Sequence, residues 1–198
     1  MSLGDMDKQY LRLLFGTKQT NQDAQHVIKN ILHRNKNTNQ PKEPMIISNK
    51  FQTITYYGFK KSLVETFKKK PKVAFILGTG GASSAVEYAL NEIKIPYKIV
   101  SRNPHLNQIH YEELNKKLLI NYSLIINTTP LGTYPDIDRC PKIPYSLLNK
   151  THYLFDLIYN PIKTKFLKLG LKKGAKVQNG HKMLIYQAEK SWELWNKI

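Results

Sequence analysis

Cysteine, acidic side chains and long apolar runs are all scarce in this chain of 198 residues. The single cysteine, Cys140, excludes an internal disulfide framework and a zinc site built from cysteines alone. No stretch approaches the roughly 18 apolar residues that a transmembrane helix needs, which excludes a membrane-spanning protein. The opening residues MSLGDMD lack the apolar segment of a signal peptide, so we expect a cytoplasmic protein. Histidines and carboxylates show no metal-ligand spacing, and no metal is predicted.

The scarcity of acidic residues leaves a large positive charge, since 31 Lys and Arg minus 14 Asp and Glu gives +17. Such a charge favours an anionic partner: nucleic acid, a membrane surface or phosphate. The basic runs at 68–70 and 172–173 have no interleaved aromatic residues, and no common nucleic-acid-binding motif is present. Nucleic acid is therefore the least favoured of the functions that we compare. Residues 73–150 carry only 8 basic and 6 acidic side chains, so the charge lies mostly outside this middle segment.

The order of apolar patterns predicts an α/β fold with a mainly parallel, Rossmann-like sheet and flanking helices. Residues 1–50 are predicted as a small helical appendage with a linker, and 51–198 as one domain that ends in a helix. Short apolar runs typical of strands alternate with helical spacings, which favours parallel strands joined by helices. We predict strands at 73–77, 97–100, 123–126, 153–157 and 175–177, and helices at 58–70, 82–93, 112–118 and 163–169.

A glycine-rich turn, Gly78-Thr79-Gly80-Gly81-Ala82-Ser83, follows the first predicted strand directly. A phosphate-binding turn between strand and helix needs glycine at the tight bend and where the backbone approaches the pyrophosphate. Gly78 and Gly80 fit these two roles, and the helix that follows offers unpaired N–H groups and a positive dipole end. Ser83 stands where this motif usually has Gly or Ala, and it is small enough for close packing. The alternative is a glycine-rich turn of purely structural use.

The second predicted strand ends in Val100-Ser101-Arg102-Asn103, about 20 residues beyond the glycines. Proteins specific for NAD place an acidic residue there to bind the ribose 2′-hydroxyl, and this sequence has none. Arg102, supported by Ser101 and Asn103, fits a 2′-phosphate instead, which favours NADP over NAD. The alternative is a solvated surface arginine.

Five sequence blocks in fixed order make the second half of the chain resemble shikimate dehydrogenase over about residues 56–198. Each block alone is weak, whereas their order and spacing together are specific. The blocks are Gly78–Ala82, Ser101–Asn103, Asn127–Gly132, Asp156–Pro161 with Thr164, and Asn179–Leu184 with Gln187-Ala188.

This resemblance implies an NADP-binding domain and hydride transfer between NADPH and 3-dehydroshikimate in aromatic amino-acid biosynthesis. It implies that Tyr159 and Gln187 contact a shikimate-like substrate, and it leaves the catalytic residues unknown. The residues implied to bind or border the cofactor are Gly78, Gly80, Gly81, Ala82, Ser101, Arg102, Asn103, Thr128, Pro130, Gly180 and Met183.

Several of these residues also have a structural interpretation. Tyr159 follows a strand, where open α/β sheets bind ligands, but an aromatic residue there also packs at a strand–loop corner. Gln187 is either a ligand contact or part of an exposed helix face, and Met183 at helical spacing is typical of a core residue. Asp156 is expected to cap backbone groups of the turn that follows it. His181 is a candidate proton donor or a surface histidine.

The resemblance also shows what this sequence lacks. The family's paired serines and its lysine in an Asn-Val-Thr-x-Pro-x-Lys segment are not recognisable, and Thr55 stands where the catalytic aspartate is expected. A hydroxyl carries no negative charge at pH 7, and general acid–base catalysis contributes about 10²–10⁴-fold in rate. Three explanations stay open: a family member with reduced or lost activity, a partner chain or second copy that completes the site, or an unrecognised substrate region in residues 1–50. A non-catalytic NADP-binding or regulatory protein is the alternative to an enzyme.

Overall fold

The computed structural model describes residues 44–67 and 70–196, and gives residues 44–53 and 192–196 by their backbone only. The predicted N-terminal helices and the linker before Pro44 lie outside the described residues, and the predicted boundary after residue 50 stays a prediction. No helix in the described part has both the length and the apolar character to cross a membrane.

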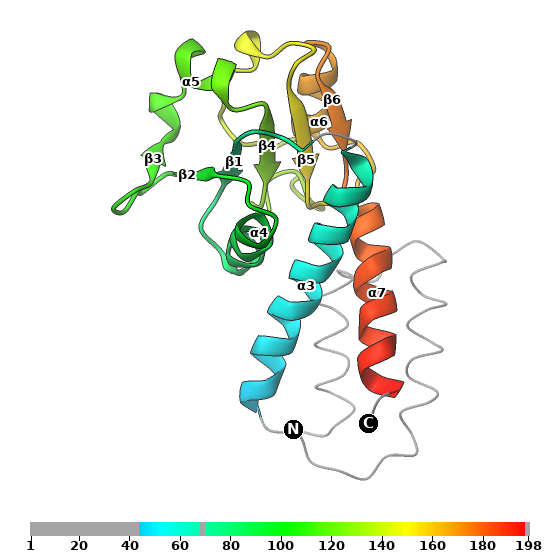
Figure 1. Ribbon diagram of the computed structural model, residues 1–198. Helices are drawn as coiled ribbons and strands as arrows, with labels where there is room; N and C mark the ends of the chain where they lie inside the picture. Colours follow the sequence, from blue (N-terminus) through cyan, green and yellow to red (C-terminus); the bar gives the residue numbers. More distant parts are fainter. Residues whose placement is uncertain (1–43, 68–69, 197–198) are drawn as a thin grey trace.

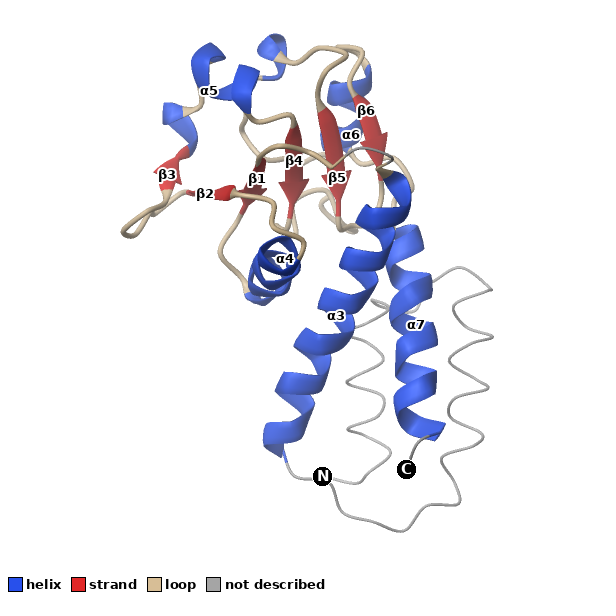
Figure 2. Ribbon diagram, viewed as in Figure 1, coloured by secondary structure: helices blue, strands red, loops and turns tan. Residues whose placement is uncertain are grey.

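Six parallel strands form one sheet in the order β3-β2-β1-β4-β5-β6, which confirms the predicted Rossmann-like α/β fold (Figure 2). The five predicted strands are present as β1 (Ala74–Leu77), β2 (Tyr97–Ser101), β4 (Leu124–Asn127), β5 (Tyr153–Asp156) and β6 (Lys176–Gln178). The two-residue strand β3 (Ile109–His110) was not predicted, because two residues are too short for an alternating pattern.

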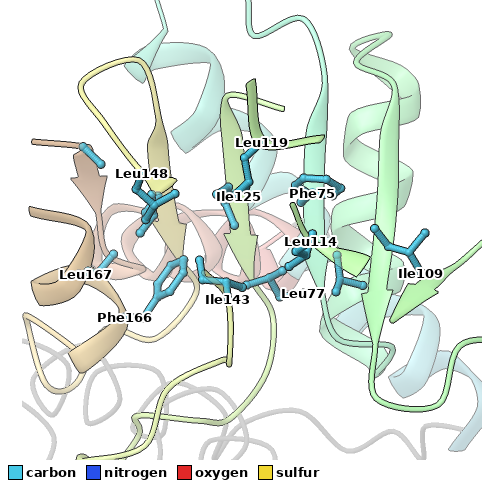
Figure 3. Packing of buried hydrophobic residues seen from close by; sticks show 13 residues of the cluster. Phe75, Leu77, Ile109, Leu114, Leu119, Ile125, Ile143, Leu148, Phe166 and Leu167 are labelled. Carbon is cyan, nitrogen blue, oxygen red and sulfur yellow. The ribbon is translucent and has the colours of Figure 1, made fainter. Parts of the chain in front are cut away.

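One face of the sheet is covered by short helices, and its core is shown in Figure 3. These helices are η2 (Tyr111–Glu113), α5 (Lys116–Asn121), η3 (Tyr145–Leu147) and α6 (Lys165–Leu171). Phe75 and Leu77 of β1 and Ile125 of β4 point to this side and pack with Phe166 and Leu167 of α6. Alternate residues of each strand therefore build this core.

The other face is covered by three longer helices: α3 (Pro44–Thr66), α4 (Gly81–Glu92) and α7 (His181–Asn196) (Figure 1). Ala74 and Ile76 of β1 pack on this side with Phe59 of α3, Val86 of α4 and Met183 of α7. Both faces of β1 are thus buried, which explains its unbroken apolar run. Helices α3 and α7 run side by side and extend well beyond the sheet (Figure 1).

Two helix predictions differ from the structure. The helix predicted at 58–70 begins at Pro44 and ends at Thr66, and a proline at the first helical position suits its fixed φ and missing N–H. The helix predicted at 112–118 is wrong as a single element, because Leu114 is extended and separates η2 from α5. The Asn115 side chain accepts a hydrogen bond from the Leu118 amide and starts a new helix there.

Candidate functional site

The order in which the chain adds strands to the sheet reverses between β1 and β4. Strand β1 pairs with β2 on one side and with β4 on the other, so the chain leaves β1 and β4 toward opposite faces. Open α/β sheets bind ligands in the crevice outside such a switch point. The glycine turn after β1 and the Asn127–Gly132 segment after β4 both lie at this edge.

Gly78 forms the tight bend at the end of β1. Its φ of +109° lies in a region that L side chains rarely adopt, and an added Cβ would lie 3.0 Å from Thr128 Oγ1. The Gly78 amide donates to the Val100 carbonyl oxygen on β2 at 2.9 Å, while Thr128 Oγ1 donates to the Leu77 oxygen at 2.7 Å. Glycine is therefore required here by both the backbone angle and the space.

Gly80 and Gly81 leave the start of α4 open. Gly80 is the N-cap with no side-chain cap, and a Cβ at Gly80 or Gly81 would meet no atom within 4 Å. The first amides of a helix have no carbonyl one turn earlier to bond, so they remain available to an anion. The buried Ser83 hydroxyl donates to the Gly80 oxygen at 2.7 Å. Ser83 was expected only to be small enough for close packing, and this hydrogen bond also stabilises the turn.

Arg102 is exposed at the carboxyl end of β2, beside the strand that leads into the glycine turn. Its neighbour Ser101 is buried, and the Ser101 hydroxyl accepts a hydrogen bond from the Asn103 amide at 3.2 Å. Burial of Tyr111 raises the pKa of its hydroxyl to about 12, and the positive charge of Arg102 acts in the opposite direction. Ser101 shapes the turn, and Arg102 is left facing solvent.

Asp156, the last residue of β5, accepts hydrogen bonds on both carboxylate oxygens. Oδ1 accepts from Asn127 Nδ2 at 3.0 Å and from the Ile158 amide at 3.1 Å, and Oδ2 accepts from Thr164 Oγ1 at 2.5 Å. The predicted capping role of Asp156 is confirmed by the Ile158 bond. Burial raises the pKa of Asp156 to about 6, although these hydrogen bonds lower it. The carboxylate thus carries a real desolvation cost at neutral pH.

This raised pKa gives a testable pH dependence of stability. The folded protein holds the Asp156 proton more tightly than the unfolded chain, whose value is 3.8, so the Asp156 contribution to the free energy of unfolding rises as the pH falls from about 6 to 3.8. Between pH 7.5 and pH 5, wild type should gain about 1 kcal/mol relative to Asp156→Asn. Urea unfolding of both proteins at the two pH values measures this difference. An unchanged difference between the two pH values would contradict a raised pKa.

Gly180 lies where α7 meets the segment after β5. An added Cβ would lie 2.0 Å from the Leu157 carbonyl oxygen, and the Gly180 amide donates to the Ile158 oxygen at 3.0 Å. Met183 is 5% exposed and packs in the core with Phe59, as expected for a core residue at helical spacing. Tyr159 is half-buried, and burial raises its pKa. The structure therefore brings Gly180 and the segment that contains Tyr159 together at the carboxyl edge.

Gln187 and Thr55 lie on the helices α7 and α3. Gln187 is buried, which excludes the exposed-face interpretation, and its Cγ would lie 2.6 Å from a Cβ added at Gly58. Thr55 is three residues before Gly58 on the same face of α3, and its Oγ1 is buried without a hydrogen-bond partner in the structure as described. Sequence reasoning missed Gly58 as the residue that lets α3 and α7 approach so closely. His181, at the start of α7, is exposed.

The exposed lysines of the strand connections lie mostly at the opposite, amino edge of the sheet. In the described connections that enter β1, β2, β5 and β6, lysines are the only charged residues, and all of them are exposed; they are Lys70, Lys72, Lys94, Lys150, Lys172 and Lys173. The total charge therefore does not mark the candidate site. Among the described residues, no group of three or more His, Cys, Asp or Glu could hold a metal ion.

Comparison with known proteins confirms the resemblance seen in the sequence, although no protein-family model matches the chain. The chain is 40% identical over 138 residues to the shikimate dehydrogenase (NADP(+)) of Methanococcus maripaludis strain C6, covering 63% of this chain and 49% of that protein. It is 32% identical over 179 residues to that of Desulforamulus reducens, covering 76% of this chain and 60% of that protein. The chain thus spans about half the length of these curated relatives.

Solved structures give the same answer for the fold. A chorismate mutase/shikimate 5-dehydrogenase fusion protein from Clostridium acetobutylicum matches with a TM-score of 0.64 and 35% identity, over 73% of this chain and 56% of that one. The Thermus thermophilus shikimate 5-dehydrogenase, solved with NADP(H) and shikimate, matches with a TM-score of 0.62 and 29% identity, over 73% and 57%. The described chain has the fold of the NADP-binding domain of these enzymes.

Proposed function

We propose that this chain, which shares sequence and fold with the NADP-binding domain of shikimate dehydrogenases, is the cofactor-binding part of such an oxidoreductase. It would bind NADPH and serve hydride transfer to 3-dehydroshikimate. The observation that carries the proposal is the open glycine turn at the start of α4, next to Arg102, which directly follows the adjacent strand β2. An anion-binding helix start and a 2′-phosphate ligand are what NADP requires of such a fold.

In this proposal the amides at the start of α4, in Gly80, Gly81 and Ala82, hold the pyrophosphate, and Gly78 makes the bend that presents them. Arg102 binds the 2′-phosphate while Ser101 and Asn103 hold its turn. Thr128 borders the cofactor through its backbone, since its hydroxyl is already bonded to the Leu77 oxygen. Gly180 and Met183 border the nicotinamide end, with Met183 acting as packing beneath it. NADPH supplies the hydride when bound.

Tyr159 and Gln187 are proposed as substrate contacts, and their geometry supports them to different degrees. Tyr159 lies after β5 at the ligand-binding edge of the sheet, which suits a substrate hydroxyl or carboxylate. Gln187 is buried beside Gly58 between α3 and α7, so a substrate that reached it would enter along these two helices.

A second candidate, a non-catalytic NADP-binding protein, is favoured by one observation. Thr55, at the position where the resemblance expects an aspartate, is buried with an unpartnered hydroxyl among the described residues. A threonine there cannot act as a carboxylate in proton transfer. In this case the chain binds NADPH and does not oxidise shikimate by itself.

Ligand titration separates these candidates from a protein with another function. NADPH at 100 times its dissociation constant should stabilise the folded chain by about 2.7 kcal/mol, visible as a rise in melting temperature. Absence of any NADPH effect up to millimolar concentration would rule out both candidates. Shikimate-dependent reduction of NADP⁺ by the pure chain would then select the enzyme. Binding without turnover would select either the second candidate or a cofactor-binding part whose site another chain completes. Repeating the assay over a range of protein concentrations tests whether two copies complete the site.

A further inference from the structure

Resting on the proposed function, we propose that Asp156 is a positioning residue that holds the loops bordering the nicotinamide half of the cofactor, and that the adenine half binds independently of it. The proposal stands on a continuous set of hydrogen bonds that starts at this one buried carboxylate. It adds to the predicted local cap a role for Asp156 in the loops after β4 and β5 and at the start of α7.

The first branch runs to the loop after β4. Asp156 and Asn127 are paired in the register of β5 and β4, and neither side chain is exposed. Asn127 Nδ2 donates to Asp156, and this orients the amide so that Asn127 Oδ1 accepts from the Thr129 amide at 3.0 Å and from Thr129 Oγ1 at 2.7 Å. Thr129 Oγ1 in turn accepts from the Leu131 amide at 3.3 Å. The carboxylate thereby fixes the backbone that follows Thr128.

The second branch runs to the start of α7. The Ile158 amide donates to Asp156 Oδ1, and the Ile158 carbonyl oxygen accepts from the Gly180 amide at 3.0 Å. One peptide unit away, the Leu157 carbonyl oxygen lies against Gly180 so closely that no side chain fits between them. Any shift of the 157–159 segment is therefore passed directly to the first turn of α7.

The third branch ties in α6. Thr164 Oγ1 donates to Asp156 Oδ2, and Thr164 also caps α6 by accepting from the Leu167 amide at 3.4 Å. Three donors thus converge on a side chain that has no proton of its own, which is why a carboxylate fits better than an amide. With asparagine at position 156, Nδ2 would face the Thr164 hydroxyl, so that hydroxyl would lose its acceptor while the other two bonds remain.

The adenine half of the proposed site lies on the other side of the switch point. Ser101 is the last residue of β2, Arg102 and Asn103 follow it, and the Ser101 hydroxyl accepts its hydrogen bond from within this turn. Among the hydrogen bonds of the described residues, none links this turn to Asp156 or Asn127. Disturbing the Asp156 bonds should therefore change binding of the nicotinamide half selectively.

Comparing two ligands separates the contribution of the adenine half of the site from that of the nicotinamide half. Adenosine 2′,5′-bisphosphate carries the adenine and the 2′-phosphate without nicotinamide, and NADPH carries both halves. For Asp156→Ala we expect NADPH to bind about 10-fold more weakly, because loop misplacement at a binding site is costly, with the bisphosphate unchanged. Asp156→Asn, which keeps two of three bonds, should fall between Asp156→Ala and wild type. Calorimetric titration of each variant measures both affinities.

Thr129→Val tests the same role should Asp156→Ala fold poorly. Valine keeps the shape of the side chain and removes the hydroxyl bonds to Asn127 and Leu131, so it should weaken NADPH binding in the same selective way. His152→Gln is the matched control, because His152 is buried and bonded to the Leu119 oxygen at the amino edge. It should lower the melting temperature without changing either affinity.

The outcomes separate this inference from the proposed function. Equal losses for the two ligands, or no loss in a folded Asp156 or Thr129 variant, would overturn the positioning role while leaving NADPH binding intact. Wild-type protein that binds neither ligand would overturn the proposed function, and the positioning role with it.

Discussion

Replacing Arg102 with alanine is expected to weaken NADPH binding by about 10- to 100-fold, because hydrogen bonds to a charged group contribute about 1.5–3 kcal/mol each. NADH has a hydroxyl where NADPH has the 2′-phosphate, so NADH affinity should change little. The preference of the protein for NADPH should therefore collapse. Fluorescence titration of the reduced cofactors with wild type and Arg102→Ala measures this ratio directly.

Arg139→Ala is the control for this experiment. Arg139 is also an exposed arginine, but it follows β4 and lies 3.6 Å from the Asp136 carboxylate. Its removal lowers the net charge by the same amount, and both affinities should stay as in wild type. An Arg102→Ala protein that loses NADPH and NADH affinity equally would show that the arginine binds a part common to both cofactors. It would then not select between them.

Replacing Gly180 with alanine is expected to lower the free energy of unfolding by about 3 kcal/mol, at the upper end of what overpacking costs. The added methyl group would stand 2.0 Å from the Leu157 carbonyl oxygen, and this neighbour is backbone rather than a flexible side chain. In a chain of this size the melting temperature should fall by about 6–12 °C. Thermal unfolding followed by circular dichroism measures the effect.

Gly80→Ala is the matched control, with the opposite signature. Its added methyl group would meet no atom within 4 Å, so stability should stay within about 0.5 kcal/mol of wild type. The same methyl group would stand where the proposed pyrophosphate approaches the backbone, so NADPH affinity should fall. If Gly180→Ala proves as stable as Gly80→Ala, the segment after β5 adjusts to α7 more freely than the structure indicates.

The sequence by itself determined the architecture, because each buried parallel strand corresponds to a short apolar run that can be recognised from neighbouring residues alone. The five predicted strands and the glycine turn after β1 depend on neighbouring residues, and the structure confirms them. Helix starts were predicted less well, because the apolar spacing found from Phe59 onward does not mark the start of α3 at Pro44.

Only the tertiary structure decided which residues act together at the carboxyl edge. Asp156 and Asn127 are 29 residues apart in the chain, and they meet because β4 and β5 are paired in register. Gly58 and Gln187 meet because two helices from opposite ends of the described chain pack side by side. Such contacts follow from strand order and helix packing, which no local pattern encodes. The scarcity of acidic residues gave the chain its charge, and the fold placed the lysines of the connections that enter β1, β2, β5 and β6 at the edge opposite the candidate site.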